Sequence, residues 1–362
     1  MMKRRSVLAL PACAALVMPS VFAADSMDPD LRRRTVRAIA GGLHYLRGQQ
    51  AQDGSVMKSV GITALALRGF LESPEKYSEA DGAFVTRQVE FLLANARPDG
   101  SISSTLQSTA YNTAVAVTAL VATKNPKYDS VIAAARKFLA GHQVDEDEGY
   151  KPDHPYYGGV GYGGGERPDL SNLYVVLEGL KAASTDPKDP VWRKAMTFVS
   201  RTQNRSESND QKWAGNDGGF AYRPGSNPPE YENGTASYGG MTAAGLLTLL
   251  FAGTDRNDPR VQAAYKWMTT HYTLETNPGT DKKHGLFYFY NAFAKVMSAY
   301  GADTFVDGKG QQRNWRNELA HKLLGLQAPD GSWANRDSRA WMEDRPQLVT
   351  AWAVIALEHT LK

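Results

Sequence analysis

Apolar positions along the chain recur at the spacing of one helical face, in segments of two alternating kinds. Residues 36–46 carry their apolar side chains every three or four positions among arginines, whereas residues 62–70 are almost free of charge. A helix with one polar face lies at the outside of a domain, and a helix that is apolar all round is buried. The alternation predicts twelve helices in six outer–inner pairs. The five further pairs are 87–93 with 111–121, 132–139 with 170–180, 191–199 with 241–251, 261–268 with 286–299, and 315–326 with 348–357.

Six such helix pairs are expected to close into a ring. Each pair can cover its apolar face only against its neighbours. An open solenoid is the competing architecture, but it needs distinct capping repeats, and here the first and last repeats share the clearest motif. We therefore predict an all-α fold, an α6/α6 toroid, which is a double-walled α/α barrel of six helix-hairpin repeats. No Ser- or Pro-rich linker divides residues 25–362, so we expect them to form a single domain.

Three copies of one heptad mark turns between predicted helices. They read Gln-Ala-Gln-Asp-Gly-Ser-Val at 50–56, Ala-Arg-Pro-Asp-Gly-Ser-Ile at 96–102 and Gln-Ala-Pro-Asp-Gly-Ser-Trp at 327–333. The Asp-Gly pair supplies the turn, and a Gln at a helix end can satisfy free backbone groups there. An architectural role for these residues is therefore expected.

The last heptad resembles the QW repeat of squalene-hopene cyclases, members of the terpenoid cyclase and protein prenyltransferase superfamily. Only residues 327–333 match that repeat in full, because Val56 and Ile102 replace its Trp and Ala96 replaces its Gln. At the level of the helix-pair repeat the resemblance extends from residue 25 to the end of the chain. It implies an α6/α6 toroid and a cavity for an isoprenoid-like molecule.

Residues 1–24 are expected to be a cleaved signal peptide rather than part of the fold. Three cations precede an apolar stretch over residues 7–22, and residues 21–23 suit signal peptidase. Arg4 and Arg5 fit the twin-arginine pattern and equally a general secretory signal, so the export route stays open. We predict a periplasmic or secreted protein. Because nothing after Asp25 is long and apolar enough to span a bilayer, stable membrane insertion is not expected.

The charge of the chain changes once the signal is set aside. The net charge of +3 is 41 cations minus 38 acids, and three of the cations lie in residues 1–24, which leaves 38 of each sign. This balance argues against a nucleic-acid partner.

The only cysteine, Cys13, lies in the signal, so no thiolate metal ligand is expected. The acidic run at 145–148 is interpreted as solvated surface, with calcium binding as the minority alternative. We expect no metal and no cofactor.

Candidate ligand-binding residues lie where the predicted inner helices begin. Those helix starts should surround the mouth of a central cavity and carry free amide donors. Aromatic side chains with a few polar groups are typical of small-molecule sites. The candidate binding residues are Tyr111, Asn112, Asn172, Tyr238, Tyr288, Tyr290, Asn291 and Trp352.

Asp169 is a candidate catalytic residue. The segment Arg-Pro-Asp-Leu-Ser-Asn at 167–172 resembles the Pro-Asp-x-Asp-Asp segment of squalene-hopene cyclases, whose middle carboxylic acid protonates an alkene. Asp169 matches the first acid, but Ser171 and Asn172 replace the other two. Neither a serine hydroxyl nor an asparagine amide can supply that proton, so the cyclisation chemistry implied by the resemblance is in doubt. The alternative is that Asp169 caps the following helix.

Glu343 and Asp344 are the remaining candidate acids. They precede the last predicted inner helix, with Trp341 and Trp352 close in sequence. Like charge and burial both raise the pKa of a carboxyl group, so such a pair can hold a proton. The alternative is that both acids cap the helix that begins at Pro346.

Three classes of function remain in view. The first is an exported, squalene-cyclase-like protein with prenyltransferase-type repeats. Its aromatic cavity would bind or cyclise an apolar, isoprenoid-like molecule. If the protein is an enzyme, it is expected to be a terpene cyclase-like isomerase or lyase. Zinc-dependent prenyl transfer is not expected, because the family's Cys ligand is missing. The second class is a polysaccharide lyase or glycan-binding α/α toroid, in which tyrosines such as Tyr162, Tyr222 and Tyr231 stack on sugars. The third is a non-catalytic periplasmic binding or scaffold domain. Protein partners are left open.

Overall fold

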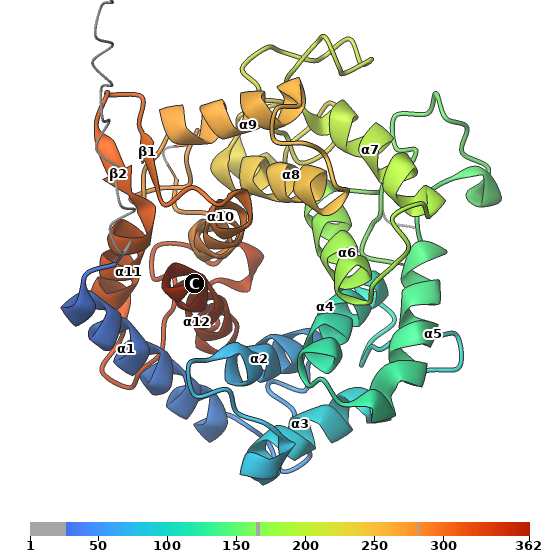
Figure 1. The fold of residues 1–362 in the computed structure, drawn as a ribbon. Coiled ribbons are helices and arrows are strands. Elements are labelled where there is room, and N and C mark those ends of the chain that lie inside the picture. The colour runs from blue at the N-terminus through green and yellow to red at the C-terminus, as the bar shows by residue number, and fades with distance from the viewer. Residues whose placement is uncertain (1–26, 164–166, 281) are drawn as a thin grey trace, which may run out of the picture.

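Twelve α-helices form two concentric rings in the computed structural model, which describes residues 27–163, 167–280 and 282–362 (Figure 1). The predicted signal peptide therefore lies outside the described residues. The inner ring consists of α2 (Val60–Glu72), α4 (Thr109–Ala122), α6 (Leu170–Ala182), α8 (Gly239–Phe251), α10 (Leu286–Tyr300) and α12 (Pro346–Leu361). The outer ring consists of α1 (Pro29–Gly48), α3 (Ala83–Ala94), α5 (Asp129–Ala140), α7 (Pro190–Thr202), α9 (Pro259–Thr270) and α11 (Trp315–Leu326).

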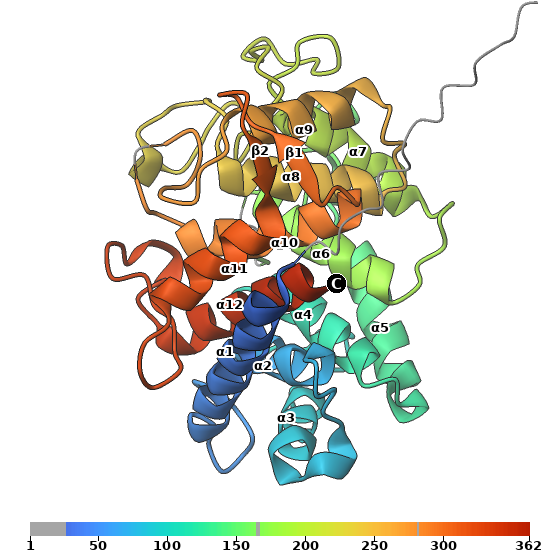
Figure 2. The same ribbon diagram turned by 60° about the vertical axis from the view of Figure 1, so that its left-hand side comes forward.

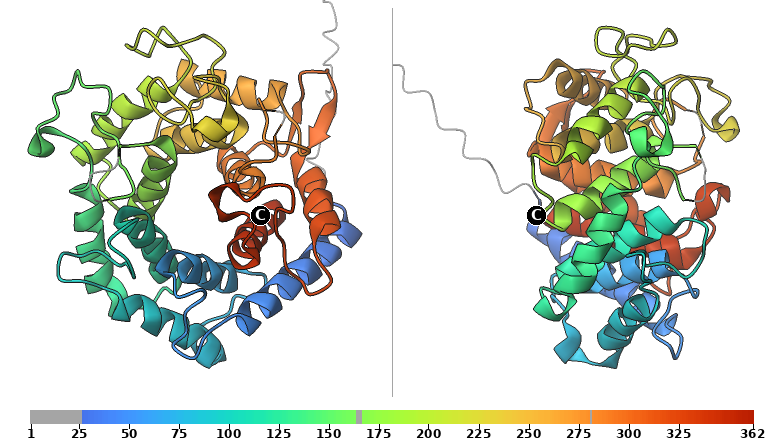
Figure 3. Two further views of the ribbon diagram at one scale, coloured as in Figure 1. Left: turned by 180° about the vertical axis from the view of Figure 1, so that it is seen from behind. Right: turned by 90° about the vertical axis from the view of Figure 1, so that its right-hand side faces the viewer.

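The inner ring is closed. Each inner helix packs against the next one along the chain, and α12 packs against α2. In the outer layer α1 packs against both α11 and α12, so the first and last repeats meet (Figure 2). Seen from behind, the same helices again form the inner ring (Figure 3). The predicted α6/α6 toroid is confirmed.

The inner helices have few charged residues because neighbouring helices cover them on most sides. In α8 every residue from Gly239 to Leu249 is buried between α6, α10 and the outer layer. In the outer helix α5 only Ala135 and Leu139 are buried, and its remaining residues face solvent or pack partly. The alternation of apolar and charged segments is thus a consequence of two-layer packing.

The heptads join neighbouring outer helices. The Gln50 side-chain amide donates to the Gly54 carbonyl at 3.1 Å and to the Phe84 carbonyl of α3 at 2.9 Å. Gln327 repeats this arrangement, and its second bond reaches Ala38 of α1, so this heptad closes the outer ring. Gly54 has φ of +87°, and a side chain there would collide with α3, which explains why the turn requires glycine.

Two further copies of this junction are present although no heptad marks them. Gln143 donates to the carbonyl of Gly158, and Gln203 to that of Gly218, each at 2.9 Å. The same amides reach the first turns of α7 and α9. Each Gln is separated from its Gly by 15 residues, because a loop is inserted into the turn. The repeat is therefore more regular in space than in sequence.

A short hairpin lies between α10 and α11 and was not predicted. Strand β1 (Thr304–Val306) pairs antiparallel with β2 (Gln312–Asn314). Asp307 organises the turn between them by accepting from the backbone of Lys309 and Gln311. Of the helices in the described ranges, none combines the length and apolar character needed to cross a membrane.

Candidate functional site

A cavity of about 500 Å³ lies where the six inner helices begin. Every inner helix or the residue just before it contributes to the lining. Eight of the lining residues are aromatic: Tyr111, Tyr162, Tyr222, Tyr231, Tyr238, Tyr288, Trp341 and Trp352. Among the described lining residues there is no carboxylate, and Lys58, exposed at the mouth, is the sole cation. The cavity is thus an aromatic chamber with little charge.

The aromatic rings of the lining support one another. Tyr231 and Tyr238 have ring centroids 4.4 Å apart, and Tyr288 meets Trp352 edge to face at 6.0 Å. Tyr222 stacks with Trp341, which belongs to the short 3-10 turn Ala340–Met342. Burial raises the pKa of Tyr238 and of Tyr288 well above the ordinary tyrosine value, so these phenols are neutral.

Unfavourable backbone conformations gather at the mouth of the cavity. Five residues other than glycine that line it have positive φ: Met57, Lys58, Ser108, Trp341 and Met342, with values from 52° to 61°. Such conformations cost free energy and persist where the surrounding structure demands them, typically near functional sites. The loops at the mouth therefore hold their side chains in a fixed arrangement around the opening.

Two hydroxyl groups meet inside the lumen. Ser171 of α6 and Tyr288 of α10 are hydrogen-bonded at 2.9 Å, although α8 lies between those two helices in the ring. Both residues line the cavity. Ser171 occupies the position at which the cyclase segment carries its proton-donating acid, so a hydroxyl group faces the chamber where an acid would be expected.

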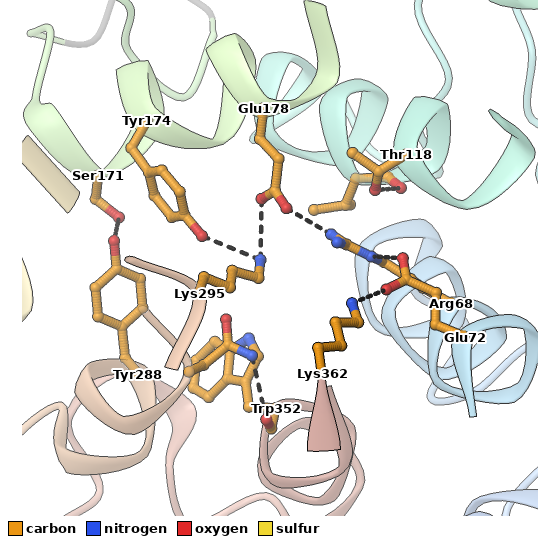
Figure 4. Close-up of polar contacts among 12 residues, drawn as sticks. Arg68, Glu72, Thr118, Ser171, Tyr174, Glu178, Tyr288, Lys295, Trp352 and Lys362 are labelled. Atoms are coloured by element: carbon orange, nitrogen blue, oxygen red, sulfur yellow. Dashed lines mark hydrogen bonds and ion pairs between the residues drawn. The ribbon is translucent and has the colours of Figure 1, made fainter. Parts of the chain in front are cut away.

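A cluster of charged side chains connects inner helices across the lumen beyond the cavity (Figure 4). Glu178 of α6 accepts from Arg68 of α2 at 2.6 Å and from Lys295 of α10 at 2.9 Å. Lys295 also donates to the hydroxyl group of Tyr174 at 3.0 Å. Burial alone would raise the pKa of Glu178, but the two cations hold it well below its ordinary value. We call Arg68, Tyr174, Glu178 and Lys295 the ion plug.

The ion plug lies beyond the inner end of the cavity lining. It joins α2, α6 and α10, which are alternate helices of the inner ring, and so spans the lumen. The cavity lining on α2 stops at Leu65, one turn before Arg68. Towards the opposite opening, Arg68 also pairs with Glu72, which is bonded to the exposed Lys362. The cavity therefore lies on the side where the inner helices begin, and the ion plug lies deeper in the ring.

Asp169 lies outside the cavity lining and caps α6. Its carboxylate accepts from the backbone N–H of Asn172 at 2.8 Å and from the Asn172 side-chain amide at 2.7 Å. The Tyr222 hydroxyl group donates to it as well. Burial raises the pKa of Asp169 to about 6, although these hydrogen bonds favour the ionised form. The capping alternative describes this geometry, because the oxygens of Asp169 are used within the protein.

Replacing Asp169 by asparagine should flatten the pH dependence of stability between about pH 4 and pH 6. The folded protein keeps a proton there that the unfolded chain, with a pKa near 3.8, has released, so the free energy of unfolding falls as pH rises through this window. The difference between wild type and Asp169→Asn should change by about 2–3 kcal/mol across it. Urea titrations of both proteins at matched pH values measure this difference, and contributions from other groups cancel. Parallel pH profiles would contradict the prediction.

Glu343 is buried and caps α10, not α12. Its carboxylate accepts from the backbone N–H groups of Leu286 at 3.0 Å and Tyr288 at 2.9 Å, and from the Asn335 amide at 2.7 Å. Burial raises its pKa to about 7. Asp344 is half-buried, pairs with Arg345 at 3.7 Å, and lies outside the lining, as Glu343 does. Glu343 therefore fixes the start of the helix that presents Tyr288 to the cavity.

The structure divides the candidate binding residues into two groups. Those that line the cavity are Tyr111, Asn112, Tyr238, Tyr288 and Trp352. Asn172, Tyr290 and Asn291 do not line it, and each donates a side-chain hydrogen bond to another part of the protein. Asn172 bonds to Asp169, the Tyr290 hydroxyl donates to the carbonyl of Leu274, and Asn291 donates to the carbonyl of Trp352 at 3.1 Å.

Several lining residues come from loops rather than from helix starts. The sequence indicated a role in sugar stacking alone for Tyr162, Tyr222 and Tyr231. It indicated no role for Met57 and Met342, which also line the cavity. The combination of glycine and tyrosine in the long loops before α6 and α8 is the signal that could have drawn attention to the tyrosines. Loops between helices of a rigid scaffold commonly carry binding residues.

Within the described ranges, no group of three or more His, Cys, Asp or Glu side chains is arranged to hold a metal ion. In the acidic run, Asp145 and Glu146 pair with Lys194 of α7 at 2.6 and 3.1 Å. A neighbouring cation thus balances part of this run.

Comparison with known proteins gives a fold but no close relative: no protein-family model matches the chain, and no curated protein matches it by sequence. Solved structures match nearly its whole length. The type II terpene cyclase MstE from Scytonema, in complex with merosterolic acid A, has a TM-score of 0.55 at 14% identity, covering 91% of this chain and 98% of MstE. Its complex with geranylgeranyl dihydroxybenzoate gives 0.56 at 13%, covering 92% and 99%.

A second kind of toroid matches equally well. A possible member of the GH105 family from Salmonella enterica has a TM-score of 0.54 at 11% identity, covering 98% of this chain and 99% of that protein. The chain therefore has a terpenoid cyclase-like α/α toroid fold, which it shares with a GH105-type protein. At these identities the likeness establishes the fold alone, so function has to be argued from the cavity.

Proposed function

We propose that the protein is an exported, squalene-cyclase-like toroid that binds an apolar, isoprenoid-like small molecule in its central cavity. The supporting observation is the chamber itself. Its walls are largely aromatic and aliphatic, and Lys58 at the mouth is the only ionised side chain among its described lining residues. Burial of apolar surface is what such a cavity offers a ligand.

Binding is supported better than cyclisation started by a carboxylic acid. Protonation of an alkene requires a neutral acid aimed into the chamber. Ser171 occupies that position, and Asp169 and Glu343 use their oxygens to cap α6 and α10 outside the lining. We therefore assign both acids to positioning the first turns of inner helices.

The glycan alternative has less support from the cavity. Glycosidases of the common mechanisms need two carboxyl groups about 5–10 Å apart beside the substrate, and lyases need a base beside a cation that neutralises a uronate. The described lining residues include no carboxyl group, and their one cation, Lys58, is exposed at the mouth. The isoprenoid reading also agrees with the ligand named for the Scytonema cyclase, a geranylgeranyl dihydroxybenzoate.

The proposal is tested by native mass spectrometry of the protein purified from its own envelope fraction, followed by organic extraction. We expect a stoichiometric polyprenyl or triterpenoid species, and a polypeptide mass that lacks residues 1–24. Titration of the emptied protein with geranylgeraniol should change tryptophan fluorescence, because Trp341 and Trp352 line the cavity. A co-purified saccharide, or an empty protein that takes up no isoprenoid, would exclude the proposal.

A further inference from the structure

The hydroxyl pair in the lumen has unused hydrogen-bonding capacity. One of the two O–H groups of Ser171 and Tyr288 donates to the other oxygen, so one proton of the pair remains to be donated. In the part of the chain that the structure describes, no other hydrogen bond to either hydroxyl group is present. Two other hydroxyl groups of the lining are used within the protein, since Tyr222 donates to Asp169 and Tyr231 to the carbonyl of His284.

The charges around this pair do not suit an anionic ligand. Lys58 is at the mouth, and the cations nearest the inner end, Arg68 and Lys295, are already paired with Glu178. A diphosphate group transferred from water into this chamber would need several charge-assisted partners to offset its desolvation. No group of acidic or histidine side chains in the described ranges offers a metal site that could bind a phosphate instead.

We propose that the ligand is a neutral isoprenoid-like molecule carrying an oxygen function, a hydroxyl or carbonyl group, which the Ser171–Tyr288 pair binds. This inference rests on the proposed function and adds the chemical class of the ligand. A carbonyl or hydroxyl oxygen accepts the remaining proton of the pair, while the hydrocarbon part packs against Ile62, Leu65 and Trp352. A pure hydrocarbon would leave that O–H group without a partner, and such a site discriminates against it.

The test compares three probes of equal chain length: geranylgeraniol, the corresponding hydrocarbon without the hydroxyl group, and geranylgeranyl diphosphate. Each is titrated into the emptied protein and followed by tryptophan fluorescence. We expect geranylgeraniol to bind about tenfold more tightly than the hydrocarbon, and the diphosphate to bind most weakly. In the double variant Ser171→Ala/Tyr288→Phe, which removes both O–H groups, the affinity for geranylgeraniol should fall to that for the hydrocarbon, and the affinity for the hydrocarbon should stay as in wild type.

Tyr290→Phe is the matched control, because it removes a hydroxyl group from the same turn of α10 that points to Leu274 and not into the cavity. It should leave the affinity ratio of alcohol to hydrocarbon unchanged. Tightest binding of the diphosphate would overturn the inference. Equal binding of alcohol and hydrocarbon, with no effect of Ser171→Ala/Tyr288→Phe, would overturn it and leave the proposed apolar binding function intact. Failure of all three probes to bind would overturn both.

Discussion

Replacing Glu178 by glutamine should lower the free energy of unfolding by about 3–5 kcal/mol, the cost of breaking a buried ion pair by removing one partner. Lys295 would then lie in the lumen without a counter-charge, and Arg68 would keep only its ion pair with Glu72. The side chains of Glu178 and Lys295 are only 13% and 7% exposed, so water cannot screen the remaining charges. Equilibrium unfolding in urea measures the change.

Lys362→Ala is the control for this prediction. Lys362 pairs with Glu72 at the outer end of the same network, but its side chain is 45% exposed. Loss of an exposed pair should cost at most about 1 kcal/mol. The double variant Glu178→Gln/Lys295→Met removes the uncompensated cation and should recover part of the lost stability. Equal, small effects of Glu178→Gln and Lys362→Ala would show that the ion plug is solvated.

The fold could be predicted from the sequence because its two layers impose different composition on alternate helices. Ring closure followed from the heptads at Gln50 and Gln327, which occur in the first and last repeats and join neighbouring outer helices. The sequence did not indicate the equivalent junctions at Gln143 and Gln203, because inserted loops separate each Gln from its turn glycine by 15 residues. A contiguous sequence motif cannot indicate a Gln–Gly contact whose two residues are close in space but far apart in the chain.

The site was harder to predict, because a carboxylate at a helix start can face the ligand or its own backbone. Asp169 and Glu343 face the N–H groups of α6 and α10, a choice made by side-chain torsions that sequence spacing does not specify. The ion plug, in contrast, has a signal in the sequence. Arg68, Glu178 and Lys295 are charges within otherwise apolar inner helices, and buried charges must pair.

Filling the cavity from two opposite walls should abolish ligand binding while the fold persists. Leu65 of α2 and Met241 of α8 both line the chamber, and tryptophan at both positions would occupy the space that the proposed ligand requires. We expect Leu65→Trp/Met241→Trp to weaken geranylgeraniol binding at least about 100-fold, equivalent to about 2.7 kcal/mol. Ligand that co-purifies with wild type should be absent from the variant in native mass spectra.

The fold should tolerate this double substitution better than most additions of volume to a protein interior. Overpacking a filled core costs about 1–3 kcal/mol per site, because neighbours must leave their preferred rotamers, but here the new rings enter existing space. Leu326→Trp, the same change at an exposed position of α11, is the control and should leave binding unchanged. If the double variant remained folded and bound geranylgeraniol as tightly as wild type, the ligand would have to occupy another surface. Loss of binding in the double variant alone would place it in the chamber between the inner helices and the ion plug, where its only polar contacts are the hydroxyl and amide groups of the wall.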